Sequence, residues 1–337
     1  MKTIDSRKSR MRVGRTLAAT LVGSALAIAG AAQADYPSQT IEFVVSYASG
    51  GSSDLAARTF ANAAERHTDA SIVVQNRAGA GGVVGTEHVY NADPDGYTIL
   101  LGRVATLAVG PASQDVPYDP DAMTYLGLLS TDPFACVTGP DQPYEHLDEL
   151  AAEIADNPGA VTYNSSGVGS LNQFAALQLM EALDVGDPAT AASHVPDQGE
   201  GPALSAVAGG HIDFFCGNLA PMLDQIQGGQ VRALLVTSEE RIEDIPDVPT
   251  VSELGYPELE NIVGWSAIVG PPDMDEEAAA YLRDLMAQVS EDEEWRNAVL
   301  DLGSIPDIRP ADESREFARN QRQGFADMVE RMGLDAD

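Results

Sequence analysis

The chain has 337 residues, of which 52 are acidic and 19 are lysine or arginine, and its formal net charge at neutral pH is −33. Such a charge disfavours binding to nucleic acid and to anionic membranes, because both attract basic surfaces. No lysine occurs after Lys8, which excludes Schiff-base, P-loop and kinase lysine chemistry from the rest of the chain.

The first 34 residues have the pattern of a cleaved signal peptide. Six basic residues lie between Lys2 and Arg15, an apolar stretch spans residues 17–29, and Ala32 and Ala34 fit the small-x-small cleavage rule. We therefore expect export and a mature chain that begins at Asp35. A retained N-terminal anchor is the alternative that this pattern leaves open.

Export and the acidic, almost lysine-free composition together indicate very salty surroundings. An exported protein meets the external medium directly. In concentrated salt the self-repulsion of such a surface is screened, because the Debye length falls to about 3 Å at 1 M. We therefore expect a halophilic source.

The first element after the signal peptide is a predicted buried strand at 41–47, rich in valine and isoleucine. Gly50 and Gly51 predict a tight turn, and Ser52 to Asp54 open an amphipathic helix that continues to residue 67. We call residues 47–54 the first turn. The N–H groups of a helix's first turn have no partners within the helix, and the helix dipole is positive there, so this turn is a candidate anion site.

Strands and helices continue to alternate through the next hundred residues. We expect a strand at 71–75, a helix at 83–91, a strand at 97–102 that ends in Arg103, short strands at 124–129 and 134–137, and a helix at 145–155. The sequence TDP at 131–133 separates the two short strands. We expect the chain to cross there from a first domain into a second.

A second glycine-rich turn repeats the pattern of the first. Residues 165–170, with the sequence SSGVGS, follow a predicted strand and precede a predicted helix at 171–183. We call them the second turn. Ligands of α/β proteins bind at the carboxyl ends of strands, so we expect the two turns to face each other across a cleft and to hold one small anion.

The remaining elements predict an α/β fold with mainly parallel sheets and helices on both faces. A proline-bearing link at 245–255 predicts the second domain crossing, and helices at 275–289, 293–302 and 312–332 end the chain. We therefore expect two domains joined by a hinge. Domain 1 comprises residues 35–131 and 256–337, and domain 2 comprises residues 132–255.

Cys136 and Cys216 both lie in apolar, strand-like segments. Export permits a disulfide between them. Free cysteine also packs as a small apolar residue in protein interiors. We favour two buried free thiols, and the disulfide is the alternative.

Several short motifs occur in a fixed order along the chain. They are YPSQTI at 36–41, GGSSD at 50–54, NRAGAGG at 76–82, PDGYTILLG at 94–102, VPYD at 116–119, HVP at 194–196, GHID at 210–213, RALLVTS at 232–238 and DVPT at 247–250. Together they resemble the extracytoplasmic solute receptors of tripartite tricarboxylate transporters, also called the Bordetella uptake gene family. The resemblance spans essentially the whole mature chain.

The resemblance implies a periplasmic-binding-protein fold of type II, the Venus flytrap, with two α/β domains and a hinge. It implies a periplasmic receptor, not an enzyme, that binds a small organic carboxylate in the interdomain cleft and delivers it to a membrane permease. We expect no cofactor, no metal and no nucleic-acid partner. We also expect the chain to be a monomer.

The residues expected to bind ligand lie in the two turns and at strand ends. They are Tyr47, Ser49, Gly50, Gly51, Ser52 and Asp54 in the first turn, Ser165, Ser166, Gly169 and Ser170 in the second turn, and Arg103, His194 and Asn218 at strand ends. The chain departs from the usual family pattern at residues 46–49, Arg103, Gln173, 197–198 and Gly217. These departures leave the choice of carboxylate open.

Three of these residues have structural alternatives. Asp54 can instead stabilise the start of its helix by about 0.3–1 kcal/mol. Arg103 can form an ion pair with an acid, rather than clamp a ligand carboxylate through two hydrogen bonds. His194 can make a structural hydrogen bond.

Two other functions are compatible with a site for small acids. A sensor that presents its ligand to a membrane kinase would keep the same fold, and neighbouring genes would distinguish it from a transport receptor. A periplasmic enzyme of small acids is the other alternative, but the sequence contains no identifiable nucleophile–base pair and no histidine pair with metal-ligand spacing. Turnover of a bound carboxylate would support the enzyme.

Overall fold

The computed structural model describes residues 36–333. The expected signal peptide and Asp35 lie outside the described residues, so the cleavage site stays a prediction. Between residues 36 and 333, no helix is both long and apolar enough to cross a membrane.

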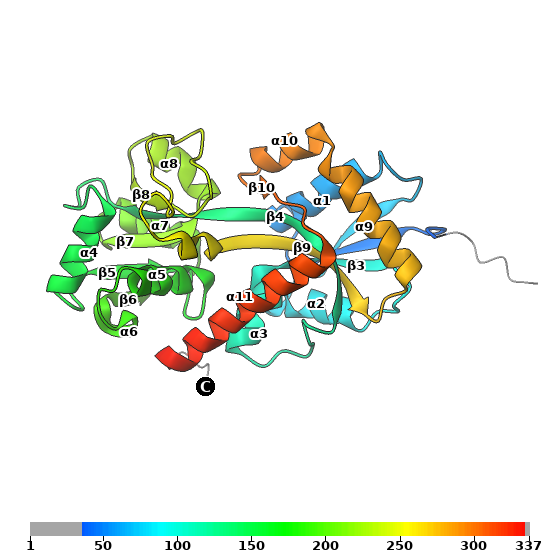
Figure 1. Cartoon of the computed structure of the whole chain (residues 1–337), viewed down its shortest axis with the longest axis horizontal. Helices are drawn as coiled ribbons and strands as arrows, with labels where there is room; N and C mark the ends of the chain where they lie inside the picture. Colours follow the sequence, from blue (N-terminus) through cyan, green and yellow to red (C-terminus); the bar gives the residue numbers. More distant parts are fainter. Residues whose placement is uncertain (1–35, 334–337) are drawn as a thin grey trace, which may run out of the picture. The chain divides into compact units, whose positions relative to one another are not determined.

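Strands and helices alternate along the described chain, as the sequence predicts (Figure 1). The strands are β1 (Ile41–Val45), β2 (Ile72–Asn76), β3 (Thr98–Arg103), β4 (Met123–Thr138), β5 (Thr162–Ser165), β6 (Ser193–Pro196), β7 (Phe214–Asn218), β8 (Arg232–Val236), β9 (Val263–Pro272) and β10 (Ile305–Pro306). The α-helices are α1 (Ser52–Ala64), α2 (Val83–Tyr90), α3 (Gly110–Ser113), α4 (Leu147–Asp156), α5 (Leu171–Ala182), α6 (Pro188–Ala191), α7 (Glu200–Ala208), α8 (Leu223–Gln227), α9 (Glu276–Ser290), α10 (Glu293–Asp301) and α11 (Ala311–Met332). Short helical segments are η1 (Ala80–Gly82), η2 (Ala105–Val109), η3 (Ala220–Met222) and η4 (Pro257–Asn261).

Two long strands, β4 and β9, organise the sheet. They pair antiparallel and run side by side in Figure 1. The strand order is β2-β1-β3-β9-β4-β7-β5-β6, with β8 and β10 also paired to β4. Pairing is parallel where β1 meets β2 and β3, and where β5 meets β6 and β7. The antiparallel pairs all include β4 or β9. The α/β alternation is as predicted, but the sheet is mixed and not mainly parallel, because its two long strands pair antiparallel with each other and with their other neighbours.

The expectation of two short strands around Pro133 is wrong, because β4 is continuous from Met123 to Thr138. Residues up to Pro133 pair with β9, and residues from Phe134 onward pair with β7 and β8. Proline cannot donate a hydrogen bond to a neighbouring strand. Pro133 lies at the point where β4 changes partners. Its missing N–H therefore does not interrupt the strand.

The expectation of two free thiols is also wrong, because Cys136 and Cys216 form a disulfide. They lie directly opposite each other in the antiparallel pair of β4 and β7. Both cysteines are also part of the buried apolar core, which is the feature that the sequence showed. Their pairing depends on the register of two strands that are 80 residues apart, which the sequence does not show.

Helix α1 is held against the sheet by one apolar face. Ala57, Phe60, Ala61 and Ala64 are buried and recur at helical spacing. The ring of Phe60 meets Phe43 of β1 edge-on, with the ring centroids 5.9 Å apart. Burial of such a side chain contributes about 1.5–3 kcal/mol, so this packing anchors α1 to the sheet.

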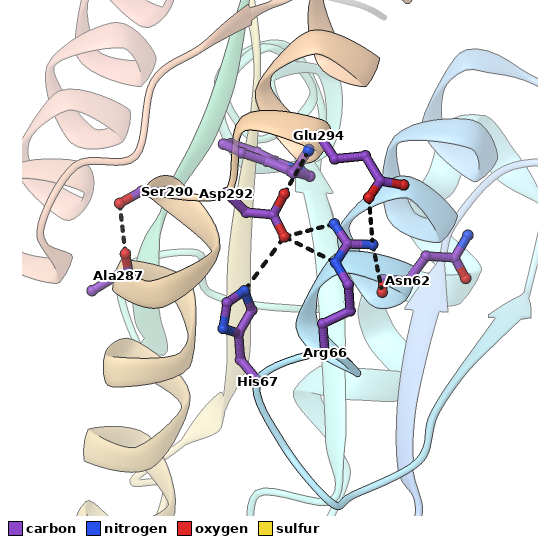
Figure 2. A network of polar contacts seen from close by, with 8 residues as sticks. Asn62, Arg66, His67, Ala287, Ser290, Asp292 and Glu294 are labelled. Atoms are coloured by element: carbon purple, nitrogen blue, oxygen red, sulfur yellow. Dashed lines mark hydrogen bonds and ion pairs between the residues drawn. The ribbon is translucent and has the colours of Figure 1, made fainter.

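A network of charged groups holds the far end of α1 to the start of α10 (Figure 2). Asp292 accepts two hydrogen bonds from Arg66, at 3.0 and 2.6 Å, and lies 3.4 Å from the ring of His67. It also caps α10 by accepting from the Trp295 N–H, which is the main reason that its pKa falls to about 2. The C-terminal end of α1 is therefore tied to the start of α10.

Helix α5 is buried more completely than α1. Residues 172–177 are all buried, and the ring of Phe174 lies 5.2 Å from that of Phe325 in α11. Ser170 caps the start of the helix, because its side-chain oxygen accepts from the Gln173 N–H. The start of α5 is therefore positioned by packing on several sides.

Candidate functional site

A cavity of about 740 Å³ lies where α1 and α5 begin. Gly51 and Ser52 line it at the start of α1, and Gly169 and Ser170 line it at the start of α5. Helix α1 follows β1, and α5 follows β5, so both helices begin near the carboxyl ends of strands. The structure thus brings the two turns to one cavity.

Most of the residues expected to bind ligand line this cavity. They are Tyr47, Gly51, Ser52, Arg103, Ser166, Gly169, Ser170 and Asn218. The others, Ser49, Gly50, Asp54, Ser165 and His194, are not among the lining residues. Ligand contact by any residue of either group stays a prediction.

The first turn is braced by a charged pair. Asp54 is buried and accepts from the Gly50 N–H at 2.9 Å, and the Ser49 hydroxyl lies 3.4 Å from the same carboxylate. Arg58 donates to Asp54 at 3.0 Å, and this bond is the largest cause of the lowered pKa of Asp54, about 2. Gly50 has a φ of 84°, a backbone angle that residues with a side chain rarely adopt. Asp54 therefore fixes the conformation of the first turn without lining the cavity itself.

The second turn is braced by neutral groups. The Gly169 N–H donates to the Gln173 side-chain oxygen at 2.7 Å, and the Gln173 amide nitrogen lies 3.3 Å from Nδ1 of His194. Nε2 of His194 lies 2.8 Å from the Ser165 hydroxyl, which is 2.8 Å from the Gly167 carbonyl oxygen. A consistent direction of donation puts the histidine proton on Nε2. Burial lowers the pKa of His194, which favours this neutral ring.

Arg103, at the end of β3, has a partner that the sequence did not reveal. Its guanidinium donates to Asp132 of β4 at 2.7 Å and to the Ser266 hydroxyl of β9 at 2.5 Å. Asp132 also accepts from Ser304 at 2.5 Å. The side chains of Arg103 and Asp132 are only 15% and 12% exposed, so the ion pair is largely buried. Arg103 nevertheless lines the cavity.

Tyr47 adds a neutral hydroxyl to the cavity lining. Burial raises its pKa, so the phenol stays protonated and able to donate. Together with the backbone N–H groups at the two helix starts, it supplies donors suited to an anion. Within the described residues, no group of three His, Cys, Asp or Glu side chains is placed to hold a metal ion.

Sequence reasoning missed Glu200 and Asn172, which both line the cavity. Asn172 is the second residue of α5, and Glu200 begins α7 after β6. The segment from β6 to α7 is a third strand–turn–helix step, and Gly199, with a φ of 121°, precedes the helix. This third glycine turn was the signal that could have identified Glu200.

The fold and this cavity define a solute-binding protein, and comparison with known proteins gives the family. A model described as "Tripartite tricarboxylate transporter family receptor" matches residues 56–334. The protein BugT of Bordetella pertussis is 33% identical over 330 residues, which cover 96% of this chain and 99% of BugT. The chain belongs to this receptor family. It is a receptor and not an enzyme, as predicted.

Solved structures agree with this assignment. A structure described as that of a periplasmic transporter is 30% identical, with a TM-score of 0.72, over 90% of this chain and all of that chain. MatC from Rhodopseudomonas palustris, solved with bound malate, is 26% identical, with a TM-score of 0.67, over 87% of this chain and all of MatC. The predicted periplasmic-binding-protein fold is therefore confirmed.

Proposed function

We propose that this receptor binds a small organic carboxylate in the cavity between the starts of α1 and α5 and delivers it to the permease of a tripartite transporter. The observation that carries the proposal is that two helix N-termini line one cavity. Each provides free N–H groups and the positive end of a helix dipole, which favour an anion. MatC, a relative of similar fold, was solved with the dicarboxylate malate.

Arg103 is proposed to strengthen carboxylate binding. A guanidinium has five N–H donors, and Asp132 and Ser266 take two of them. The remaining donors of a cavity-lining arginine can serve a ligand without breaking the ion pair. Asp132 then fixes the direction in which Arg103 presents them.

The proposed two-domain division explains how the site closes. Strand β4 pairs with β9 up to Pro133, and with β7 and β8 from Phe134 onward. This change of partners lies close to the proposed domain boundary at residue 131. A ligand that bound both turns would favour the closed arrangement of residues 35–131 with 256–337 against residues 132–255. We propose that the mature receptor acts in the periplasm as a monomer.

Calorimetry on the exported protein at high salt tests the proposal. Malate, succinate, citrate and benzoate, together with the amino acids used in the next section, should include at least one ligand with a dissociation constant in the micromolar range or below. If none of these acids gives a measurable heat of binding, carboxylate binding at this site is contradicted.

Arg103→Ala should weaken binding of the identified acid by about 1.5–3 kcal/mol, because a charge-assisted hydrogen bond is lost. Arg77→Ala is the matched control, since Arg77 pairs with Glu42 and does not line the cavity. Equal affinity of the Arg103 variant and the unaltered receptor would rule out the clamp.

A further inference from the structure

Glu200 places a negative charge in a cavity proposed to bind an anion. It lines the 740 Å³ cavity and an adjoining smaller one, and Arg103 and Asn218 line both as well. Arg103 and Glu200 are the charged side chains among the residues that line the larger cavity. Asp132 already pairs with Arg103 at 2.7 Å. The negative charge of Glu200 is therefore in excess.

The carboxylate of Glu200 is fixed through one of its two oxygens. Oε1 accepts from the side-chain amides of Asn172 at 2.7 Å and of Asn218 at 2.8 Å. All hydrogen bonds that residues 36–333 donate to this carboxylate go to Oε1. The second oxygen, Oε2, therefore accepts no hydrogen bond from residues 36–333, and it belongs to a side chain that lines both cavities.

Asn218 provides a second acceptor beside Glu200. Its amide nitrogen faces Glu200, which fixes the side-chain orientation, and within the described chain no donor contacts its Oδ1. A Cβ added at Gly264 would lie 3.1 Å from this Oδ1 and 3.0 Å from Oδ2 of Asp132. Gly264 thus leaves room for acceptors at this wall, where the Arg103–Asp132 pair and the Glu200–Asn218 pair meet.

The cavity therefore has two kinds of wall. Helix starts supply donors, which suit a carboxylate. Glu200 Oε2 and Asn218 Oδ1 supply acceptors, which suit an ammonium group because it has donors only. We propose that Glu200 selects ligands with both groups, namely small amino carboxylates, over the corresponding acids without nitrogen. This inference rests on the proposed function and names its substrate class.

The hydrogen bonds of Glu200 alone do not account for its charge. A glutamine at position 200 could still accept from Asn172 and Asn218 through the same oxygen. A plain dicarboxylate would bring further negative charge to Glu200, whereas an ammonium group would offset it. Substitution by glutamine therefore separates the selective role from a bracing role.

The test is calorimetry with acids that differ by one amino group. The pairs are L-aspartate with succinate, L-glutamate with glutarate, and L-alanine with propionate, each titrated at high salt into the unaltered receptor, Glu200→Gln and Glu243→Gln. Glu243 is exposed and does not line either cavity, so its variant controls for the loss of one charge. Thermal unfolding checks that each variant is folded.

The unaltered receptor and Glu243→Gln should bind at least one amino acid at least tenfold more tightly than its nitrogen-free partner. Glu200→Gln should lose at least tenfold of that preference. If the nitrogen-free acids bind as tightly as the amino acids, the inference is overturned while the proposed function stands. If Glu200→Gln does not fold, this comparison on the unaltered receptor still decides whether amino carboxylates are preferred.

An unchanged preference in folded Glu200→Gln would likewise overturn the role of Glu200. Absence of binding by these acids and by malate, citrate and benzoate would overturn the proposed function, and the inference with it.

Discussion

The first and second turns look alike in sequence but are braced by different chemistry. Asp54 and Arg58 hold the first turn through a charged pair, and Gly50 is bound to the same carboxylate. His194 and Gln173 hold the second turn through a neutral network. Two turns that serve one cavity should therefore lose their bracing at different pH values.

Removal of the disulfide should loosen the second turn more than the first. The bridge joins β4 to β7, and the Asn172 side chain donates to the Cys216 carbonyl oxygen at 3.1 Å, so α5 is tied to the bridged strand. Cys136→Ala combined with Cys216→Ala should cost about 2–5 kcal/mol of unfolding free energy. Chemical denaturation measures this loss, and hydrogen exchange should rise more in α5 than in α1. Equal denaturation midpoints for the variant and the oxidised receptor would contradict the prediction.

Asp54→Asn should break the brace of the first turn. It removes a charge-assisted bond to a half-exposed arginine, so the expected loss at pH 7 is about 1–2 kcal/mol of unfolding free energy. The folded pKa of Asp54, about 2, lies below its ordinary value. The stabilisation is therefore complete above about pH 4 and is lost as the pH falls towards 2. Urea denaturation at pH 7 and pH 3 should show the variant approaching the unaltered receptor in acid.

Asp292→Asn is the matched control for Asp54→Asn. The pKa of Asp292 is also about 2, but this residue caps α10 and does not brace the first turn. Both variants should lose the same kind of acid-sensitive stability, and only Asp54→Asn should weaken ligand binding. Equal loss of affinity in both would show that the first turn has no special link to the ligand.

The second turn should respond to pH nearer neutrality. Burial lowers the folded pKa of His194, so the unfolded chain binds the proton more readily. The stability that the neutral ring contributes is therefore complete above about pH 6.5, the ordinary pKa of histidine, and falls as the pH drops below that value. His194→Gln should cost about 1 kcal/mol of unfolding free energy at pH 7.5 and should remove part of this pH dependence.

His211→Gln serves as the control, because His211 is exposed and does not line the cavity. Denaturation midpoints between pH 5.5 and 7.5 compare the two variants. If the denaturation midpoint depends on pH equally in His194→Gln and in the control, His194 does not brace the second turn.

The sequence predicted what depends on neighbouring residues. Gly50 and Gly169 revealed both turns, because a glycine turn between a strand and a helix is a local pattern. The amphipathic pattern that follows Asp54 predicted α1 for the same reason. The predicted family and fold rested on motifs spread along the whole chain, and both were confirmed by the comparisons.

What the sequence did not predict depends on contacts between distant segments. The partner of Arg103 is Asp132, on a different strand, and the pairing of Cys136 with Cys216 depends on strand register. Pro133 predicted a break in β4, but pairing with β9 on one side and β7 on the other carries the strand through. Glu200 follows a glycine turn that is visible in the sequence, but its contact with Asn172 of α5 depends on the fold.

A crystal structure of the receptor with the acid identified by calorimetry would show directly whether the two turns hold one anion. We expect a ligand carboxylate within about 3 Å of backbone N–H groups in the first turns of both α1 and α5, the ordinary hydrogen-bond range. A carboxylate that contacts neither helix start, or a ligand bound outside this cavity, would contradict the claim that the two turns hold one anion.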